Sequence, residues 1–283
     1  MKHGQHKSPI SLGPVVSTTN SLLAIFSNWL DYRMKELLPL VCSYTKNSTE
    51  IIQDLQQLKL PNNAVLFSAD AKSMYTNIDT DIGIKALQDF LLTNAPHIPA
   101  NFPIQPFLQI LEIVMKINIF AFQDSHWLQL SGTAMGTPAA CAYATLTYGH
   151  YKNTVILPTY NRNLLYYRRY VDDKFGIWIP SATDNLQAWE SFKKSLNNWV
   201  KLEWLIEEPS QATNFLDLTL HISNSKIETK MFQKPMNLYL YIPAGLAHPP
   251  SCLKGLIIGE TQRYGLQKSM SLKQSSRSSC NAS

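Results

Sequence analysis

Two apolar and aromatic runs, residues 164–170 and 174–179, flank a short segment that contains Asp172 and Asp173. Short runs of this composition are typical of β-strands, and strands joined by so short a connection form an antiparallel hairpin. The sequence therefore predicts a hairpin with two carboxylates in its turn. A further apolar run ends at Asp70. If its strand lies beside the hairpin, the three carboxylates meet at one edge of the sheet.

Helical spacing of apolar residues recurs outside these runs. It predicts helices over residues 21–41, 48–58, 81–92, 106–116, 139–151 and 184–200. Shorter runs predict a hairpin with strands 119–122 and 127–130, and further strands over 202–207, 215–222 and 226–232. Long helices mixed with hairpins, without a repeated strand–helix–strand rhythm, indicate an α+β fold with an antiparallel sheet packed on helices.

Composition narrows the class of protein further. Hydrophobic residues make up 45% and charged residues 16% of the 283 residues, which excludes a disordered chain and allows a sizeable core. The four cysteines include no closely spaced pair, so neither a CxxC metal site nor a disulfide framework is expected. No secretory leader and no apolar run of ~18 residues occurs. We therefore expect an intracellular protein, nuclear or cytoplasmic, without a membrane-spanning segment.

The positive charge is concentrated at one end of the chain. Residues 248–283 contain five cations against Glu260 alone, so they hold nearly all of the net charge of +5. The preceding residues are close to neutral, which makes the overall charge a weak indication of nucleic-acid binding. Seven serines within residues 269–283 predict a disordered tail.

The carboxylates of Asp70, Asp172 and Asp173 point to metal chemistry. Clustered carboxylates repel one another and are costly unless cations neutralise them. Hard oxygen ligands of this kind suit Mg²⁺, and two such ions ~3.5–4 Å apart hold the attacking and leaving oxygens of a phosphoryl transfer. Taken by themselves, two Asp residues between strands are also ordinary turn chemistry. The neighbouring motifs distinguish these two interpretations.

Three ordered motifs contain or surround the acids. Tyr170-Val171-Asp172-Asp173 resembles the aromatic-x-Asp-Asp signature of reverse transcriptases, and Asp70 followed by Tyr75 resembles their first catalytic motif. The family's Gly-rich motif is similar to the residues between them, Gln129, Gly132, Met135, Gly136 and Pro138. Four segments narrow the resemblance to the reverse transcriptases of Penelope-like retroelements, over residues 8–265: 74–78, 132–138, 214–218 and 248–255.

This resemblance implies a right-hand polymerase fold of the reverse-transcriptase type, with a palm and partial fingers. We expect residues 1–265 to form that domain and residues 266–283 to form the Ser-rich tail. The implied activity is RNA-directed DNA polymerisation, a two-metal nucleotidyl transfer to a primer 3′-OH. The implied partners are an RNA or DNA template with its primer, dNTPs and two Mg²⁺ ions, with Mn²⁺ as an alternative metal. The sequence indicates no protein partner.

The resemblance also assigns roles to individual residues. Asp70, Asp172 and Asp173 are the expected catalytic and metal-binding residues; Asp70 and Asp172 would bind both ions and Asp173 would support the site. The backbone at Ala71 would approach the triphosphate. Tyr75 would lie beneath the incoming sugar, where a bulky ring disfavours a 2′-OH and so selects deoxynucleotides. A plain core position is the alternative for Tyr75.

Small and basic residues complete the expected site. Gly132 and Gly136 would let the backbone approach the template or the nucleotide, because a glycine has no Cβ in the way. The alternative is that both belong to the entry of the following helix. Lys230 or Lys234 would protonate the leaving pyrophosphate, with a surface charge as the alternative.

Two departures from the family lower the expected activity. Gly13 stands where related enzymes carry an Arg that grips the triphosphate, and losing such a contact weakens nucleotide affinity by about 30- to 1000-fold. The sequence also shows no thumb, so we expect a truncated fragment. The alternative function is a non-catalytic retroelement remnant that folds and binds nucleic acid weakly. A metal-dependent phosphoryl transferase or nuclease is a third alternative, which the spacing from Asp70 to Tyr75 and the Gly-rich loop disfavour.

Overall fold

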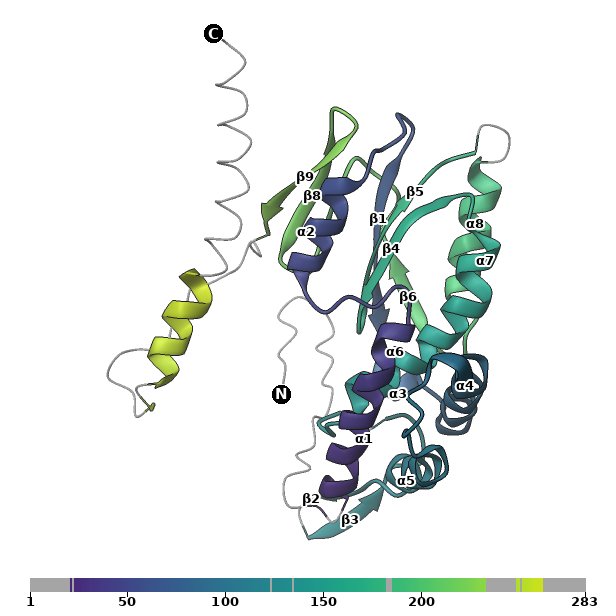
Figure 1. Ribbon diagram of the computed structural model, residues 1–283, viewed down its shortest axis with the longest axis vertical. Coiled ribbons are helices and arrows are strands. Elements are labelled where there is room, and N and C mark those ends of the chain that lie inside the picture. The colour runs from purple at the N-terminus through teal and green to yellow at the C-terminus, as the bar shows by residue number, and fades with distance from the viewer. Residues whose placement is uncertain are drawn as a thin grey trace.

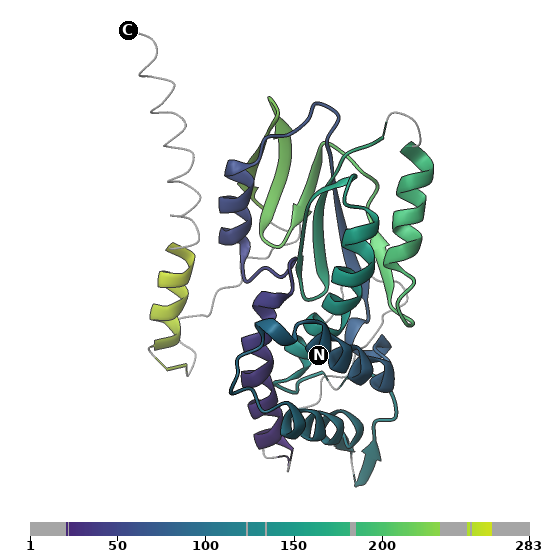
Figure 2. The same ribbon diagram turned by 45° about the vertical axis from the view of Figure 1, so that its right-hand side comes forward.

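The computed structural model describes residues 21, 23–122, 124–133, 135–181, 185–232, 248–249 and 251–261. Gly13, Lys234 and the tail 266–283, which the sequence singles out, lie outside these residues. A four-stranded antiparallel sheet forms the centre of the described part, and helices pack on it (Figures 1 and 2). This arrangement confirms the expected α+β class with an antiparallel sheet packed on helices.

The central sheet joins segments that are far apart in the sequence. Its strands are β1 (Val65–Lys72), β4 (Leu164–Tyr170), β5 (Asp173–Trp178) and β6 (Glu203–Ile206). Their order is β4-β5-β1-β6, and each neighbouring pair is antiparallel. The expected hairpin around Asp172 is the β4–β5 hairpin, and the run that ends at Asp70 belongs to β1, its neighbour.

Two helices cover one face of this sheet, α6 (Ala140–Tyr151) and α8 (Asn185–Leu196). Helix α6 is buried on nearly all sides, as expected for a helix without a polar face. Its Tyr148 ring lies 5.0 Å from the ring of Trp204 in β6. From α8, the Phe192 ring lies 5.4 Å from that of Phe67 in β1. These aromatic contacts belong to the larger of two hydrophobic cores.

On the opposite face, α2 (Ser48–Gln57) and a three-stranded antiparallel sheet form the second core. That sheet contains β7 (Ala212–Phe215), β8 (Leu218–Ser223) and β9 (Lys226–Met231), in this order. Ile51 of α2, Phe175 of β5 and Phe215 of β7 are buried together in the second core. Asn47 caps α2, since its side chain accepts a 3.1 Å hydrogen bond from the N–H of Glu50.

The predicted strand over 215–222 corresponds mainly to β8, and β7 was not predicted. The chain turns between the two strands, with Phe215 at the end of β7 paired to Leu218. Leu216 takes a φ of 56° in this turn. Asp217 is a common turn residue, but Leu216 continues the apolar run, so the run looks continuous in the sequence.

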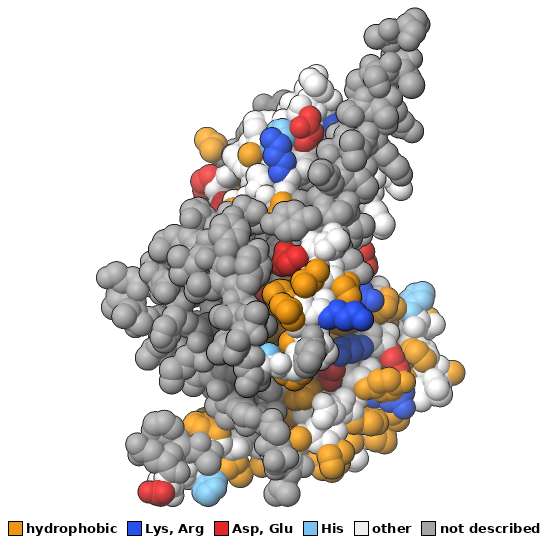
Figure 3. Space-filling model, turned by 90° about the vertical axis from the view of Figure 1, so that its left-hand side faces the viewer, with side chains coloured by type: hydrophobic (Ala, Val, Ile, Leu, Met, Phe, Trp, Pro, Cys, Tyr) orange, Lys and Arg blue, Asp and Glu red, His pale blue; other side chains and the backbone are white. Residues whose placement is uncertain are grey.

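Three helices lie beyond the end of the sheet: α1 (Ala24–Leu37), α4 (Thr80–Thr93) and α5 (Ile104–Lys116). Helices α1 and α4 pack on α6, and α5 packs on α1 and α4. The hairpin of β2 (Ile119–Phe122) and β3 (Ser125–Leu128) lies at the same end of the molecule (Figure 1). The second strand therefore begins two residues earlier than the predicted 127–130. Figure 3 shows apolar side chains gathering at this end of the described surface. Within the described residues, no helix is both long and apolar enough for a bilayer span.

Helix α6 ends at Tyr151, the predicted residue. Two further helical segments follow it directly, a π-helical turn, Lys152–Ile156, and the short α7 (Leu157–Thr159). The Lys152 side chain is fully buried, 5.8 Å from the centroid of the Tyr167 ring, and its ammonium has no hydrogen-bond acceptor among the described residues. Burial, and then the positive charge of Arg169, lower the pKa of Lys152 well below its ordinary value.

We expect Lys152→Met to raise the free energy of unfolding, most of all at neutral pH. Because the pKa of Lys152 is lowered in the folded state, the unfolded chain binds more protons between that pKa and the ordinary value of 10.5. The free energy of unfolding of the wild type therefore rises with pH across that window. The difference between Lys152→Met and wild type shrinks as the pH approaches 10.5. Urea unfolding from neutral to alkaline pH measures the difference. The exposed Lys85→Met is the control, and a difference that does not change with pH would contradict the prediction.

Candidate functional site

The three carboxylates predicted from the sequence lie at one end of the central sheet. Asp70 in β1 is directly opposite Asp173 in β5, and opposite residues of an antiparallel pair project from the same face. The N–H of Ala71 donates a 2.9 Å hydrogen bond to the carbonyl of Asp172, which ties the hairpin turn to β1. Asp70 and Asp172 are exposed, and Asp173 is partly buried.

The carboxylates are adjacent without forming a closed ligand set. Nowhere in the described part of the chain do three His, Cys, Asp or Glu side chains group as they would around a metal ion. The N–H of Ala71 is already bonded to Asp172, so a contact from this N–H to a phosphate requires that bond to exchange. The structure therefore brings the three acids together at an exposed end of the central sheet.

The turn that carries Asp172 is strained. Tyr170 and Asp173 are the last paired residues of the hairpin, which leaves Val171 and Asp172 as the turn. Val171 takes a φ of 49°, in the left-handed region that a β-branched residue rarely adopts. Such a conformation costs about 1–3 kcal/mol and persists only where the surroundings hold it, which is common at functional turns.

Tyr75 lies in the short helix α3 (Met74–Asn77), which follows β1. Its hydroxyl is 3.3 Å from Sγ of Cys141 in α6. Burial, then the contact with Cys141 and the negative charge of Asp172, raise the pKa of Tyr75. The hydroxyl therefore stays protonated at neutral pH. Tyr75 packs partly against the larger core and also lies near enough to Asp172 to sense its charge.

The Gly-rich loop packs against α3. Gly132 has a φ of 79°, and a Cβ placed on it would lie 2.7 Å from the backbone Cα and O of Thr76. The next residue, Thr133, donates a 2.6 Å hydrogen bond to the carbonyl of Tyr75. The structure thus explains why residue 132 is a glycine: the backbone of Thr76 lies too close for a Cβ. Gly136 has a φ of 106° and is exposed.

We expect Gly132→Ala to lower the free energy of unfolding by about 1–3 kcal/mol, since Ala is strained at positive φ and here also meets the Thr76 backbone. Gly259→Ala is the matched control, because a Cβ there meets no atom within 4 Å and its φ is not positive. The control should be neutral or stabilising by up to about 1 kcal/mol. Urea unfolding measures both. Equal effects of the two substitutions would show that the loop contact is unimportant for stability.

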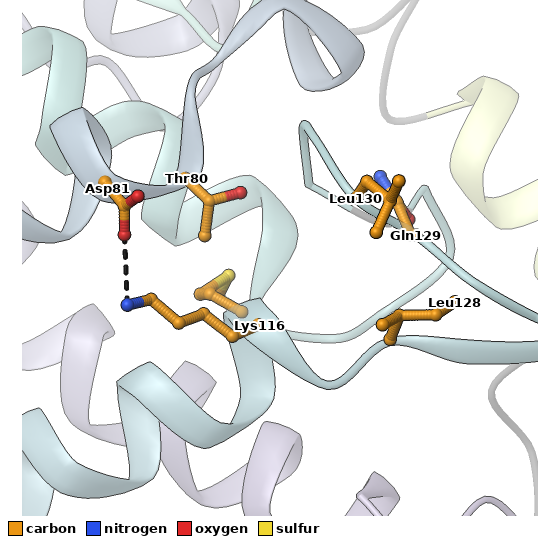
Figure 4. Close-up of a pocket in the computed structure, with 7 residues that line it drawn as sticks. Thr80, Asp81, Lys116, Leu128, Gln129 and Leu130 are labelled. Carbon is orange, nitrogen blue, oxygen red and sulfur yellow. Dashed lines mark ion pairs between the residues drawn. The ribbon is translucent and has the colours of Figure 1, made fainter.

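A hollow of about 230 Å³ lies between the start of α4, the end of α5 and the end of the β2–β3 hairpin (Figure 4). On one side of it, Lys116 of α5 pairs with Asp81 of α4 at 3.0 Å. The hollow is lined by Thr80, Asp81, Met115, Lys116, Leu128, Gln129 and Leu130. None of the three sheet-end acids lines it, so we treat it as separate from the candidate site.

Two residues of this region were not predicted from the sequence. Cys141 contacts Tyr75 from a different helix, and nothing local in the sequence reveals that approach. Arg169 is fully buried beneath the turn, opposite Lys174 in the β4–β5 register. Arg and Lys are rarely buried, so two cations within an otherwise apolar hairpin are unusual. This pattern was the signal in the sequence for a special role of Arg169.

No family model and no curated protein sequence matches the chain. Solved structures of polymerases do match. Apo telomerase from Candida tropicalis, truncated from its C-terminal domain, is 11% identical over 75% of this chain and 46% of its own, with a TM-score of 0.51. Telomerase from Candida albicans in complex with a fragment of telomeric RNA is 10% identical over 75% of this chain and 39% of its own, with a TM-score of 0.53.

A viral enzyme matches to the same degree. The BmCPV RNA-dependent RNA polymerase at its elongation state is 13% identical over 72% of this chain and 20% of its own, with a TM-score of 0.52. The chain thus spans less than half the length of each of these structures. At such identities the likeness concerns the fold alone. The chain has a polymerase fold of the palm-and-fingers type, shared with telomerases and RNA-dependent RNA polymerases.

Proposed function

We propose that this chain is the palm and partial fingers of an RNA-directed DNA polymerase of the Penelope-like retroelement type. It adds nucleotides from dNTPs to the 3′-OH of a primer on an RNA or DNA template. The observation that carries the proposal is the strand pairing that sets Asp70 opposite Asp173, beside the turn with Asp172, at an exposed sheet end. The polymerase fold supports it. The proposed domain spans residues 1–265, followed by the tail 266–283.

The donor set fits a divalent metal by its chemistry. All three side chains offer hard carboxylate oxygens, and Asp70 and Asp172 are exposed to ions and phosphates. Asp70 and Asp172 would hold two Mg²⁺ ions, or Mn²⁺, and Asp173 would support them. Such ions, when bound, stabilise the negative charge on the attacking 3′-oxygen and on the leaving pyrophosphate.

The remaining residues orient the substrates. Ala71 fixes Asp172 through its N–H, and its proposed contact with the triphosphate forms when that bond exchanges. The ring of Tyr75 would support the sugar and exclude a 2′-OH. Gly132 holds the Gly-rich loop against Tyr75 and Thr76, so the loop with Gly136 reaches the nucleotide from a fixed base. Lys230, proposed to protonate the leaving pyrophosphate, lies in β9, in the separate three-stranded sheet.

A non-catalytic remnant is the alternative function. The observation that favours it is the lack of a closed carboxylate group among the described residues. Gly13, in the position of a phosphate-gripping Arg, and the near-neutral charge before residue 248 also favour it. Such a protein would fold and bind nucleic acid weakly, since few cations neutralise phosphates.

Primer extension tests the proposal. Purified protein is given a DNA primer annealed to an RNA or a DNA template, with dNTPs and Mg²⁺, and Asp172→Asn is the control. Extension by wild type that the control lacks supports the polymerase. Nucleic-acid binding without extension in Mg²⁺ or Mn²⁺ supports the remnant. Cleavage of template or primer by wild type would instead identify a metal-dependent nuclease.

A further inference from the structure

We propose that Arg169 is a positioning residue, whose guanidinium holds the strained turn that presents Asp172. The inference rests on the proposed function and deepens it, because Arg169 acts through Asp172 and touches no substrate. Arg169 lies in β4, three positions before Asp172, and is only 1% exposed. Its side chain points away from the open edge where the acids lie, towards helix α6.

The guanidinium connects the turn to the buried helix. Nη1 donates to the carbonyl of Val171 at 3.1 Å and to that of Ala144 at 3.4 Å. Nη2 donates to the carbonyls of Ala144 and Thr145 in α6. A planar guanidinium serves several acceptors in fixed directions, which the single ammonium of Lys does not. The turn is thereby tied to the most buried helix of the described structure.

The backbone of Arg169 is fixed as well. Its N–H donates a 2.7 Å hydrogen bond to the carbonyl of Ser43, and its carbonyl accepts a 3.1 Å hydrogen bond from the N–H of Thr45. Both partners belong to the segment between α1 and α2. The side chain of Arg169 therefore extends from the fixed strand β4 to the buried helix α6, and on the way it also binds the carbonyl of Val171.

Asp172 is consequently held on both sides. The carbonyl before it, that of Val171, accepts from Arg169, and the carbonyl of Asp172 itself accepts from the N–H of Ala71. Val171 has a φ of 49°, a conformation that persists only while its surroundings enforce it. Removing the bond from Arg169 frees the peptide between Val171 and Asp172, so the carboxylate loses its fixed direction.

The matched pair Arg169→Lys and Arg168→Lys tests the proposal. Arg168 is the adjacent residue, and it pairs with Asp54 at 2.8 Å and donates to the carbonyl of Cys42. The readouts are kcat and the Mg²⁺ concentration for half-maximal primer extension, with thermal unfolding as the measure of folding. Arg169→Lys should lower kcat by about 10- to 100-fold and raise that Mg²⁺ concentration about tenfold. Arg168→Lys should leave both within about twofold.

A second variant separates positioning from folding. Gly adopts positive φ without strain, so Val171→Gly should restore part of the kcat that Arg169→Lys loses. Wild-type kcat and Mg²⁺ dependence in a folded Arg169→Lys protein would overturn the proposal. Failure of both Arg169→Lys and the double variant to fold would overturn it too, because Arg169 would then serve the fold alone.

A measurement of metal binding tests the role of Arg169 separately from the proposed polymerase function. If the wild-type chain extends no primer in Mg²⁺ or Mn²⁺, the polymerase assignment fails, and Mn²⁺ binding to the full chain is then measured by electron paramagnetic resonance. Weaker Mn²⁺ binding by Arg169→Lys, with Arg168→Lys unchanged, supports the positioning role. Equal binding by the two variants, or no binding by wild type, overturns it.

Discussion

Asp172→Asn is expected to lower the rate of primer extension by at least about a thousandfold while leaving the fold intact. Bound metal ions contribute several kcal/mol of transition-state stabilisation, and about 1.4 kcal/mol corresponds to tenfold in rate. Asn keeps the size of the side chain but removes the charge that would hold the ion. Because Asp172 is exposed, its charge is not required for burial of the core. Asp70→Asn should behave in the same way.

Single-turnover extension at saturating dNTP measures these variants. Asp89→Asn is the control, since Asp89 lies in α4 and forms a surface pair with Lys85 at 3.5 Å. Its rate should stay within about twofold of wild type, because exposed pairs contribute little. Retention of a tenth or more of the wild-type rate by folded Asp172→Asn would show that the metal is held elsewhere.

The hairpin and its neighbour were predictable because their apolar runs are short and end in acids. Strand β5 is buried over nearly its whole length, and residues 175–178 contain no polar side chain, as a strand buried on both faces requires. The pairing of β1 with β5 was only a condition of the sequence argument; the structure has it, and it sets Asp70 opposite Asp173. The turn at Leu216 was not predictable, because Leu216 continues the apolar run and is not a residue that normally signals a turn.

The candidate site was predictable only in part. The acids and Tyr75 lie on strand ends and one following turn, so their neighbourhood follows from local sequence and one strand pairing. The contact of Gly132 with Thr76 joins residues more than fifty positions apart, and no local pattern reveals it. Arg169 is fully buried, and its two terminal nitrogens donate to carbonyls of α6 and of Val171, which lie far away or around a turn. Such long-range compensation is what allows a charge inside a core.

Tyr75→Ala is expected to lower the preference for deoxynucleotides over ribonucleotides by about 10- to 100-fold. Forcing an extra group into a filled space costs about 1–3 kcal/mol, and removing the ring removes that penalty for a 2′-OH. The half-buried ring lies near Asp172, where the incoming sugar is proposed to bind.

Tyr75→Phe separates the ring from the hydroxyl. Phe keeps the bulk but loses the contact with Sγ of Cys141, which is 3.3 Å from the hydroxyl. If bulk causes the discrimination, Phe preserves it and Ala loses it, as measured by the ratio of kcat/KM for dNTP and rNTP. If both variants lose it equally, the hydroxyl is responsible, acting through its bond to α6. An unchanged ratio in Tyr75→Ala would mean that the ring serves the core alone, because a side chain that touches the sugar must change the ratio when it is removed.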